Sequence, residues 1–185
     1  LYLTGGVPVY GLPESFSNIF GFGSFIGIPT PVLVTAGLVA VVYFLLNWTK
    51  TGRYLCAVGG NIKASALSGI NTKFILFLAY IVCSILATVS GLLLTARLET
   101  GEANIGVSMP LESIAACVIG GVSLKGGVGR VENVVLGALF IGLIQNGMNL
   151  ARIESYLHTV VIGILLIVAV TSDQFRQRLI AKSQD

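Results

Sequence analysis

The sequence predicts an all-α, polytopic transmembrane helical bundle, and its composition and charge pattern both point to that class. Of the 185 residues, 55% are hydrophobic and only 10% are charged, and the mean hydropathy is +0.91. Soluble domains carry about a quarter charged residues. Charged side chains are absent from four stretches, residues 15–49, 74–96, 133–151 and 155–172. Each stretch has 18 residues or more, and a helix that crosses the hydrocarbon core needs roughly 20.

The same numbers exclude a cytosolic enzyme, a secreted disulfide scaffold and a disordered chain. The net charge of +3 is small and the basic residues form no patch, so we expect no nucleic-acid partner. Cys56, Cys83 and Cys117 form no C-x-x-C pair, so packed thiols are favoured over a metal site or a disulfide. His158 is the only histidine, which argues against metal or proton-relay chemistry. The chain begins at Leu1 without a basic segment, so we expect no signal peptide and a missing N-terminal part.

About four clear spans and one short or broken crossing are expected. Residues 1–29 are rich in Gly, Phe and Ser and predict an irregular extracytoplasmic loop. The transmembrane domain is expected over residues 30–172, with clear spans at residues 30–48, 74–96, 134–150 and 156–171. Pro29 and Pro31 suit the start of the first span, because the first N–H groups of a helix have no partners within it.

A shorter apolar segment lies at residues 113–121, after Pro110. Its pattern leaves open whether it is a short, broken or extended helix. The polar tail at residues 173–185 is expected to be helical and cytoplasmic.

The orientation follows from the distribution of Lys and Arg, which favour cytoplasmic loops. Nine lie in residues 49–73, 122–133 and 173–185, whereas Arg97 and Arg152 alone lie in the segments between them. We therefore place those three segments in the cytoplasm. This assignment requires the chain near residues 114–122 to cross the membrane.

Small residues predict where helices pack in the bilayer, because they allow backbones to approach closely. Two such stripes are expected to form packing seams: Cys83, Ala87 and Gly91; and Ala138, Gly142 and Asn146. A polar cluster near the outer end of one span consists of Gln145, Asn146 and Asn149. It has two interpretations, interhelical hydrogen bonds and the lining of a translocation path. No Asp, Glu or Lys lies at a span centre, which argues against an ion-coupled carrier.

The densest motif is the glycine-rich segment at residues 120–130, GGVSLKGGVGR. It matches neither GxxxxGK[ST] nor a strand–GxGxxG–helix unit, so a nucleotide site is not indicated. Glycines there suit tight turns and close backbone contacts. The segment is either a bare connection between helices or a docking element for a partner protein.

A second cytoplasmic segment contains a short predicted helix. Asn61 is expected to cap it, residues 64–67 to form its body and Gly69 to end it. Its role is left open between an amphipathic surface element and a contact element.

Two runs resemble cytoplasmic motifs of the permeases of bacterial ABC sugar importers of the ribose, galactose and xylose type. They are GRYLCAVGGNIKASALSGIN at residues 52–71 and ESIAACVIGGVSLKGGVGR at residues 112–130. Residues 137–150 followed by 156–170 are similar to the family's C-terminal helix pair. Branched-chain amino-acid permeases share the glycine elements, but the insertion of Ser123 and Leu124 is more similar to the sugar type. Glu132 and Asn133 depart from the family pattern, which has a small residue and glycine there.

The resemblance implies a permease subunit of the bacterial inner membrane that has no catalytic residues, ATPase site or cofactor of its own. It implies a path for a ribose-like monosaccharide, a separate cytoplasmic ATPase that uses ATP, a periplasmic sugar-binding protein and a second permease subunit in a homodimer. A branched-chain amino-acid permease, an ATP-independent carrier or channel, and a non-transport scaffold are the alternatives.

On this resemblance, two sets of residues are expected to dock the ATPase. The first is Gly121, Ser123, Lys125, Gly126, Gly127, Gly129 and Arg130, and the second is Asn61, Ala64, Ser68 and Gly69. The path lining would come from Gln145, Asn146 and Asn149.

Overall fold

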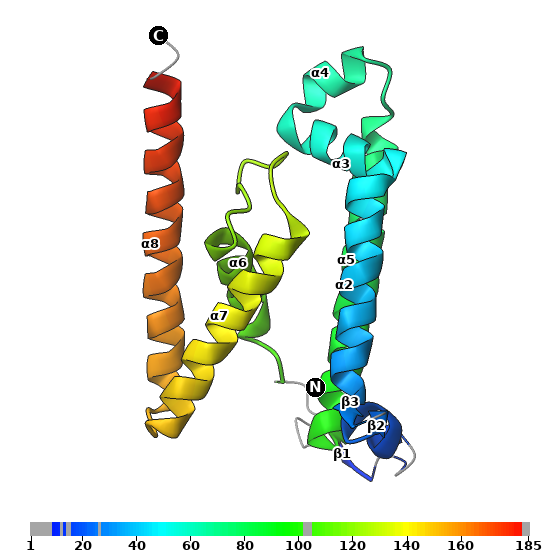
Figure 1. Ribbon diagram of the computed structural model, residues 1–185, viewed down its shortest axis with the longest axis vertical. Helices are drawn as coiled ribbons and strands as arrows, with labels where there is room; N and C mark the ends of the chain where they lie inside the picture. Colours follow the sequence, from blue (N-terminus) through cyan, green and yellow to red (C-terminus); the bar gives the residue numbers. More distant parts are fainter. Residues whose placement is uncertain (1–8, 12, 14–15, 26, 102–104, 183–185) are drawn as a thin grey trace. The chain divides into compact units, whose positions relative to one another are not determined.

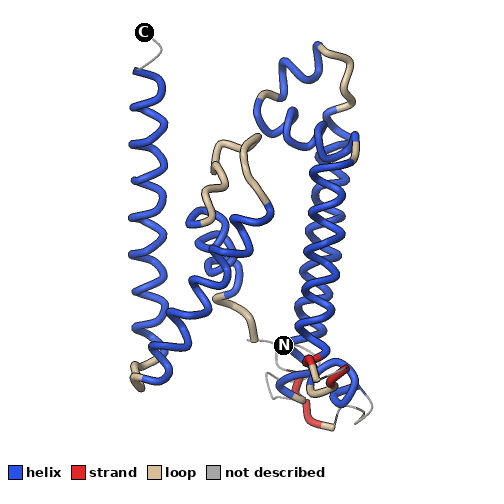
Figure 2. Tube along the Cα trace, viewed as in Figure 1, coloured by secondary structure: helices blue, strands red, loops and turns tan. Residues whose placement is uncertain are grey.

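The structure, a computed structural model, describes residues 9–11, 13, 16–25, 27–101 and 105–182, and these are mostly helical (Figures 1 and 2). The chain divides into two compact units, residues 1–58 with 63–107, and residues 59–62 with 108–185. The helices are η1 (Ser17–Gly21), α2 (Thr30–Trp48), α3 (Lys50–Gly60), α4 (Ile62–Leu67), α5 (Thr72–Leu98), α6 (Met109–Ile119), α7 (Val131–Leu150) and α8 (Ser155–Lys182). The strands are β1 (Val9–Tyr10), β2 (Ser24–Phe25), β3 (Ile28–Pro29) and β4 (Thr100–Gly101).

Three described helices, α2, α5 and α7, are long and apolar enough to cross a membrane. They contain the predicted spans 30–48, 74–96 and 134–150, which confirms these three. The fourth predicted span, 156–171, forms an apolar part of α8 that is shorter than the other three. α8 continues to Lys182, so the tail is helical as predicted up to that residue, and residues 183–185 lie outside the described part.

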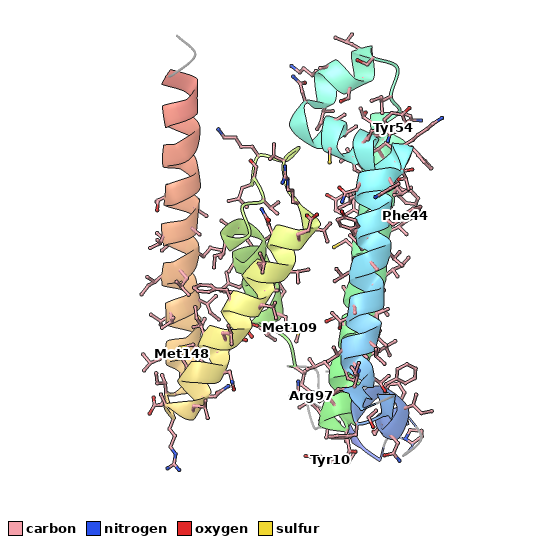
Figure 3. All side chains as sticks on the ribbon, in the orientation of Figure 1. Tyr10, Phe44, Tyr54, Arg97, Met109 and Met148 are labelled. Atoms are coloured by element: carbon pink, nitrogen blue, oxygen red, sulfur yellow. The ribbon has the colours of Figure 1, made fainter. Side chains whose placement is uncertain are left out.

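The first unit contains α2 and α5, whose side chains are largely exposed within that unit. α2 buries none of its residues, and Phe44 projects away from its axis (Figure 3). An apolar helix that is exposed on all sides is stable in lipid or against other helices, but not in water. Asn71 caps α5, since its side-chain oxygen accepts a hydrogen bond of 3.2 Å from the N–H of Phe74.

The sequence analysis assigned no helix to residues 50–60, and the structure corrects this with α3. Thr49 forms the corner between α2 and α3. Its hydroxyl donates to the carbonyl of Leu45 at 2.6 Å and accepts from the N–H of Gly52 at 3.2 Å. A Cβ on Gly52 would collide with the carbonyls of Leu45 and Leu46, so glycine allows α3 to fold back tightly on the end of α2.

The short helix α4 confirms the prediction for the segment that follows. It begins directly after Asn61 and ends before Gly69, whose φ is +81°. The N–H groups of Gly69 and Ile70 donate to the carbonyls of Ala66 and Ser65, at 3.0 and 3.1 Å. This pair of bonds is the Schellman motif, in which a left-handed residue ends a helix.

The predicted irregular loop at residues 1–29 is more structured than expected where it is described, and residues 1–8 lie outside that part. Residues of β1 pair with β4 in antiparallel register, Val9 with Gly101 and Tyr10 with Thr100, and β2 pairs with β3. η1 packs against α5, where a Cβ on Gly21 would collide with the carbonyl of Ala96. A close approach between segments distant in sequence therefore orders this region, and the local composition carried no signal of it.

The second unit is built on α6, α7 and α8. Its core consists of Ala115, Ala116, Ile141 and Ile162, with Leu111, Ile119 and Leu166 packed against them. Figure 1 shows α7 returning from the loop after α6, and α8 running back in the opposite direction. Met109 and Met148 mark the start of α6 and the end region of α7 (Figure 3). With 11 residues, α6 is a continuous helix about 16 Å long, so of the alternatives left open the structure has the short helix, and it starts earlier than the predicted residue 113.

α6 and α7 meet through glycines with almost no side chain between their backbones. A Cβ on Gly137 would collide with the carbonyl of Ala116 and lie 3.0 Å from the nitrogen of Gly120. A Cβ on Gly120 would lie 2.5 Å from the carbonyl oxygen of Asn133. α7 begins at Val131, so Glu132 lies in its first turn, where the helix dipole favours an acid. The family departure at Glu132 and Asn133 is thus accommodated inside the helix.

The two predicted packing seams are exposed within their own units, and their packing against other helices stays a prediction. The buried positions of α7 are Gly137, Ile141 and Met148, whereas Ala138, Gly142 and Asn146 are exposed. On α5, Cys83, Ala87 and Gly91 are also exposed. A pattern of small residues does not say which of two adjacent stripes packs inward, and on α7 the stripe one residue earlier meets α6.

We predict that Gly137→Ala destabilises the second unit, because its methyl group collides with the backbone of α6. Overpacking of this kind costs about 1–3 kcal/mol. Gly142→Ala is the matched control, since a Cβ there meets nothing within 4 Å. Thermal unfolding in detergent, followed by circular dichroism, should show a lower midpoint for Gly137→Ala alone. Equal midpoints for the two variants would contradict the packing described here.

Candidate functional site

The glycine-rich motif forms an ordered turn at residues 121–130, here called the 121–130 turn, which begins where α6 ends. The N–H groups of Gly121 and Val122 donate to the carbonyls of Val118 and Cys117, at 2.9 and 3.0 Å. Gly121 has a φ of +76°, a conformation that glycine adopts without a steric penalty. These bonds form a second Schellman motif, so α6 ends at a defined place and the chain leaves in a defined direction.

Ser123 closes the 121–130 turn by three hydrogen bonds. Its N–H donates to the carbonyl of Val128 at 3.0 Å, and its own carbonyl accepts from the N–H of Gly126 at 3.0 Å. Its hydroxyl oxygen accepts from the N–H of Lys125 at 3.3 Å. Gly126 and Gly127 then take φ values of +90° and +76°. The turn is therefore held by its own backbone, with Ser123 at its base.

The tip of the 121–130 turn exposes both apolar and basic side chains. Leu124 is 60% exposed and Val128 is 69% exposed, and Lys125 and Arg130 are also exposed. The sequence analysis named the glycines and charges but missed Leu124 and Val128. The sequence did contain an indication of these two residues, because a connection that only links two helices usually carries polar side chains and this glycine-rich one carries two large apolar ones. A rigid turn that presents apolar and basic groups can bind another protein.

Residues 59–62, which belong to the same unit, contact this turn. A Cβ on Gly59 would lie 2.8 Å from the nitrogen of Gly127, and a Cβ on Gly126 would lie 2.5 Å from the carbonyl oxygen of Gly59. The structure therefore places the start of the second predicted docking segment, next to Asn61, in contact with the first predicted docking segment, the 121–130 turn. The remaining candidates Ala64, Ser68 and Gly69 belong to the other unit, where all three are exposed.

The predicted path residues lie at the far end of α7. Asn146 is 15 positions after Val131, which places it about 22 Å along the helix from the 121–130 turn. Gln145 is half-buried, and Asn146 and Asn149 are exposed. Amides on an exposed face of a span can contact a polar solute or another helix.

His158 lies near the start of α8, and its Nε2 atom is buried without a hydrogen-bond partner among the described residues.

The site contains groups suited to binding and none arranged for covalent chemistry in the part described. No group of three or more His, Cys, Asp or Glu that could hold a metal ion occurs among the residues that the structure describes. The three cysteines, at positions 56, 83 and 117, are free thiols.

Comparison with known proteins identifies the family. Residues 3–170 match a family described as the permease component of branched-chain amino-acid transport systems. The ribose import permease of Escherichia coli strain K12 is 39% identical over 158 residues, which are 85% of this chain and 49% of that protein. The ribose import permease of Bacillus subtilis is 38% identical over 175 residues, 94% of this chain and 54% of that protein. A D-allose transport system permease of Escherichia coli strain K12 is 39% identical over 174 residues, 94% and 52% respectively.

The chain spans about half the length of the curated relatives it matches. No solved structure matches it. The matched region contains α2 to α7 and the apolar part of α8 up to residue 170, including the 121–130 turn and the amides of α7. The chain is a multi-pass protein of the bacterial inner membrane, and it belongs to the family of transport-system permease components whose sequence model it matches over residues 3–170.

Proposed function

We propose that the chain is part of the permease subunit of an ATP-binding-cassette importer that forms the path of a monosaccharide across the inner membrane. The observation that carries this proposal is the identity of 38–39% to ribose and allose permeases over 85–94% of the chain. The family description names branched-chain amino acids as the transported solute. The individual relatives cited above are instead named for ribose and allose. A ribose-like sugar is therefore favoured over an amino acid as the substrate.

In this proposal the 121–130 turn docks a separate cytoplasmic ATPase. The 185 residues contain no nucleotide-binding motif, so in this proposal a separate ATPase supplies the free energy for transport. A permease responds to ATP only if the ATPase makes different contacts in its two conformations. The hydrogen bonds of Ser123 hold the turn in one conformation. A turn that keeps its conformation can pass a movement of the ATPase on to the helices of the permease.

The side chains of the 121–130 turn indicate the chemistry of the ATPase surface. Leu124 and Val128 are large, exposed apolar groups that would provide most of the affinity when buried. Lys125 and Arg130 would mainly increase the association rate and the specificity. The complementary surface is therefore an apolar pocket with an acidic rim.

The amides Gln145, Asn146 and Asn149 would line the sugar path at the opposite end of α7. Sugar hydroxyls need hydrogen-bond partners when they leave water, and amides both donate and accept. A periplasmic sugar-binding protein would deliver the solute to that end, and a second copy of the permease would complete the path.

The proposed function predicts ATP-dependent sugar uptake. The complete permease would be reconstituted in vesicles with the ATPase and the binding protein of the same gene cluster. We expect uptake of labelled ribose when ATP is present with the ATPase, and none of labelled leucine. Uptake without the ATPase would instead indicate a secondary carrier, and uptake of leucine alone would indicate an amino-acid permease.

Asn146→Leu is expected to change the KM for ribose, and Asn146→Gln is expected to retain the KM of the unaltered permease.

Docking is predicted to depend on the shape of the 121–130 turn. Gly126→Val and Gly127→Val place a β-branched residue at a positive φ, at a cost of about 1–3 kcal/mol each. We expect each to lower co-purification of the ATPase by about tenfold, which corresponds to about 1.4 kcal/mol. Membrane insertion should be unchanged. Gly91→Val, on an exposed part of α5 with open space at its Cβ, is the control. Unchanged co-purification in both turn variants would refute the docking assignment.

A further inference from the structure

Three glycines join residues 59–62 to the 121–130 turn, and we call Gly59, Gly126 and Gly127 the glycine joint. The contact is backbone against backbone, since a Cβ on Gly59 would come within 2.8 Å of the nitrogen and 3.3 Å of the Cα of Gly127. In the other direction, a Cβ on Gly126 would come within 2.5 Å of the oxygen and 3.1 Å of the carbonyl carbon of Gly59. Real Cβ atoms do not approach backbone this closely, so a side chain at either position would force the segments apart.

Each side of the glycine joint is stiff by itself. The 121–130 turn is closed by the three hydrogen bonds of Ser123, and Gly59 and Gly60, which belong to the same unit, are helical. Two stiff segments in direct backbone contact cannot slide past each other without a clash, because closely packed groups resist small displacements. A force applied to one segment is therefore passed to the other.

We propose that residues 59–62 and the 121–130 turn form one docking element for the cytoplasmic ATPase, and that the glycine joint holds the two together. This inference rests on the proposed function and deepens it, because it replaces two separate contacts by a composite one. Ile62, which is 52% exposed, then adds to the apolar surface of Leu124 and Val128. The occupant is a protein surface with an apolar pocket and acidic rim, since the exposed charges of this element are the basic Lys125 and Arg130.

The composite element makes a residue outside the 121–130 turn necessary for docking. Gly59→Ala leaves the turn's sequence intact but inserts a methyl group into the glycine joint. In the complete transporter we expect Gly59→Ala to lower ATPase co-purification by about tenfold. This is the same decrease that we predict for Gly126→Val and Gly127→Val. Gly37→Ala is the control, because a Cβ on this glycine of α2 meets nothing within 4 Å. Co-purification of Gly59→Ala equal to that of the control would overturn the inference.

A disulfide tests the contact between the two segments separately from ATPase docking. A Cβ on Gly60 would lie 3.8 Å from the Cα of Gly127, which is close enough for a disulfide between Gly60→Cys and Gly127→Cys. The pair would be introduced after Cys56, Cys83 and Cys117 are replaced by serine, and the linked peptide detected by mass spectrometry. We expect the link to form in the membrane-inserted protein. Failure of the link to form would overturn the inference.

These outcomes separate the joint from the proposed function. If the disulfide forms but Gly126→Val leaves ATPase binding intact, the joint exists and the docking assignment fails. If Gly126→Val and Gly127→Val abolish docking while Gly59→Ala behaves as its control, the proposed function stands and the composite element fails.

Discussion

The contact between the backbones of α6 and α7 determines the geometry of the second unit. Gly120 and Gly137 remove the side chains that would otherwise separate the two helices, so the end of α6 lies directly on the first turns of α7. Ala115 and Ala116 are buried at this crossing, and α8 also packs against α6. Because the 121–130 turn connects the two helices at their point of closest approach, both of its ends are fixed by the same contact.

Glycine performs two separate tasks in this region. At Gly59, Gly120 and Gly137 it allows backbone segments to touch, and at Gly121, Gly126 and Gly127 it allows positive φ angles. Gly126 and Gly127 take part in both tasks, since they adopt positive φ and also contact Gly59. Backbone groups that a partner protein covers need hydrogen-bond partners, because an unpaired buried N–H or C=O group is costly. The Schellman motif at the end of α6 and the three bonds of Ser123 provide these partners for much of the turn, which leaves its apolar and basic side chains free to bind a partner.

The sequence predicted the elements whose signal is local. Long charge-free stretches located α5 and α7 to within a few residues, because the bilayer excludes charge over a fixed length, and Pro29 and Pro31 marked the start of α2. α4 lies between Asn61 and Gly69 as predicted, and the left-handed Gly69 ends it, which is a signal carried by a single residue. α3 was missed because three of its 11 residues are glycines, which weaken helical propensity, whereas the corner at Thr49 and Gly52 stabilises it. η1 was missed because its packing against Ala96 joins segments more than 70 residues apart.

The glycines and charges of the candidate site were predicted from the motif and the family resemblance, but its three-dimensional composition was not. That Leu124 and Val128 are exposed follows only from the way Ser123 closes the turn. That Gly59 contacts Gly126 and Gly127 depends on a pairing of distant segments, for which one sequence contains no signal. The choice of Gly137 over Ala138 as the packing residue of α7 likewise depends on how α6 is placed.

Docking of a cytoplasmic ATPase requires the 121–130 turn to face the cytoplasm while the connection between α7 and α8 faces outward. A membrane-impermeant thiol reagent tests this orientation directly, with Lys125→Cys or Arg152→Cys as the single cysteine of the complete protein. In intact spheroplasts the reagent is predicted to label the cysteine at position 152 and not the one at position 125, and in inverted vesicles the pattern should reverse. Labelling of position 125 from outside intact cells would contradict the account, because no cytoplasmic ATPase could then reach the turn.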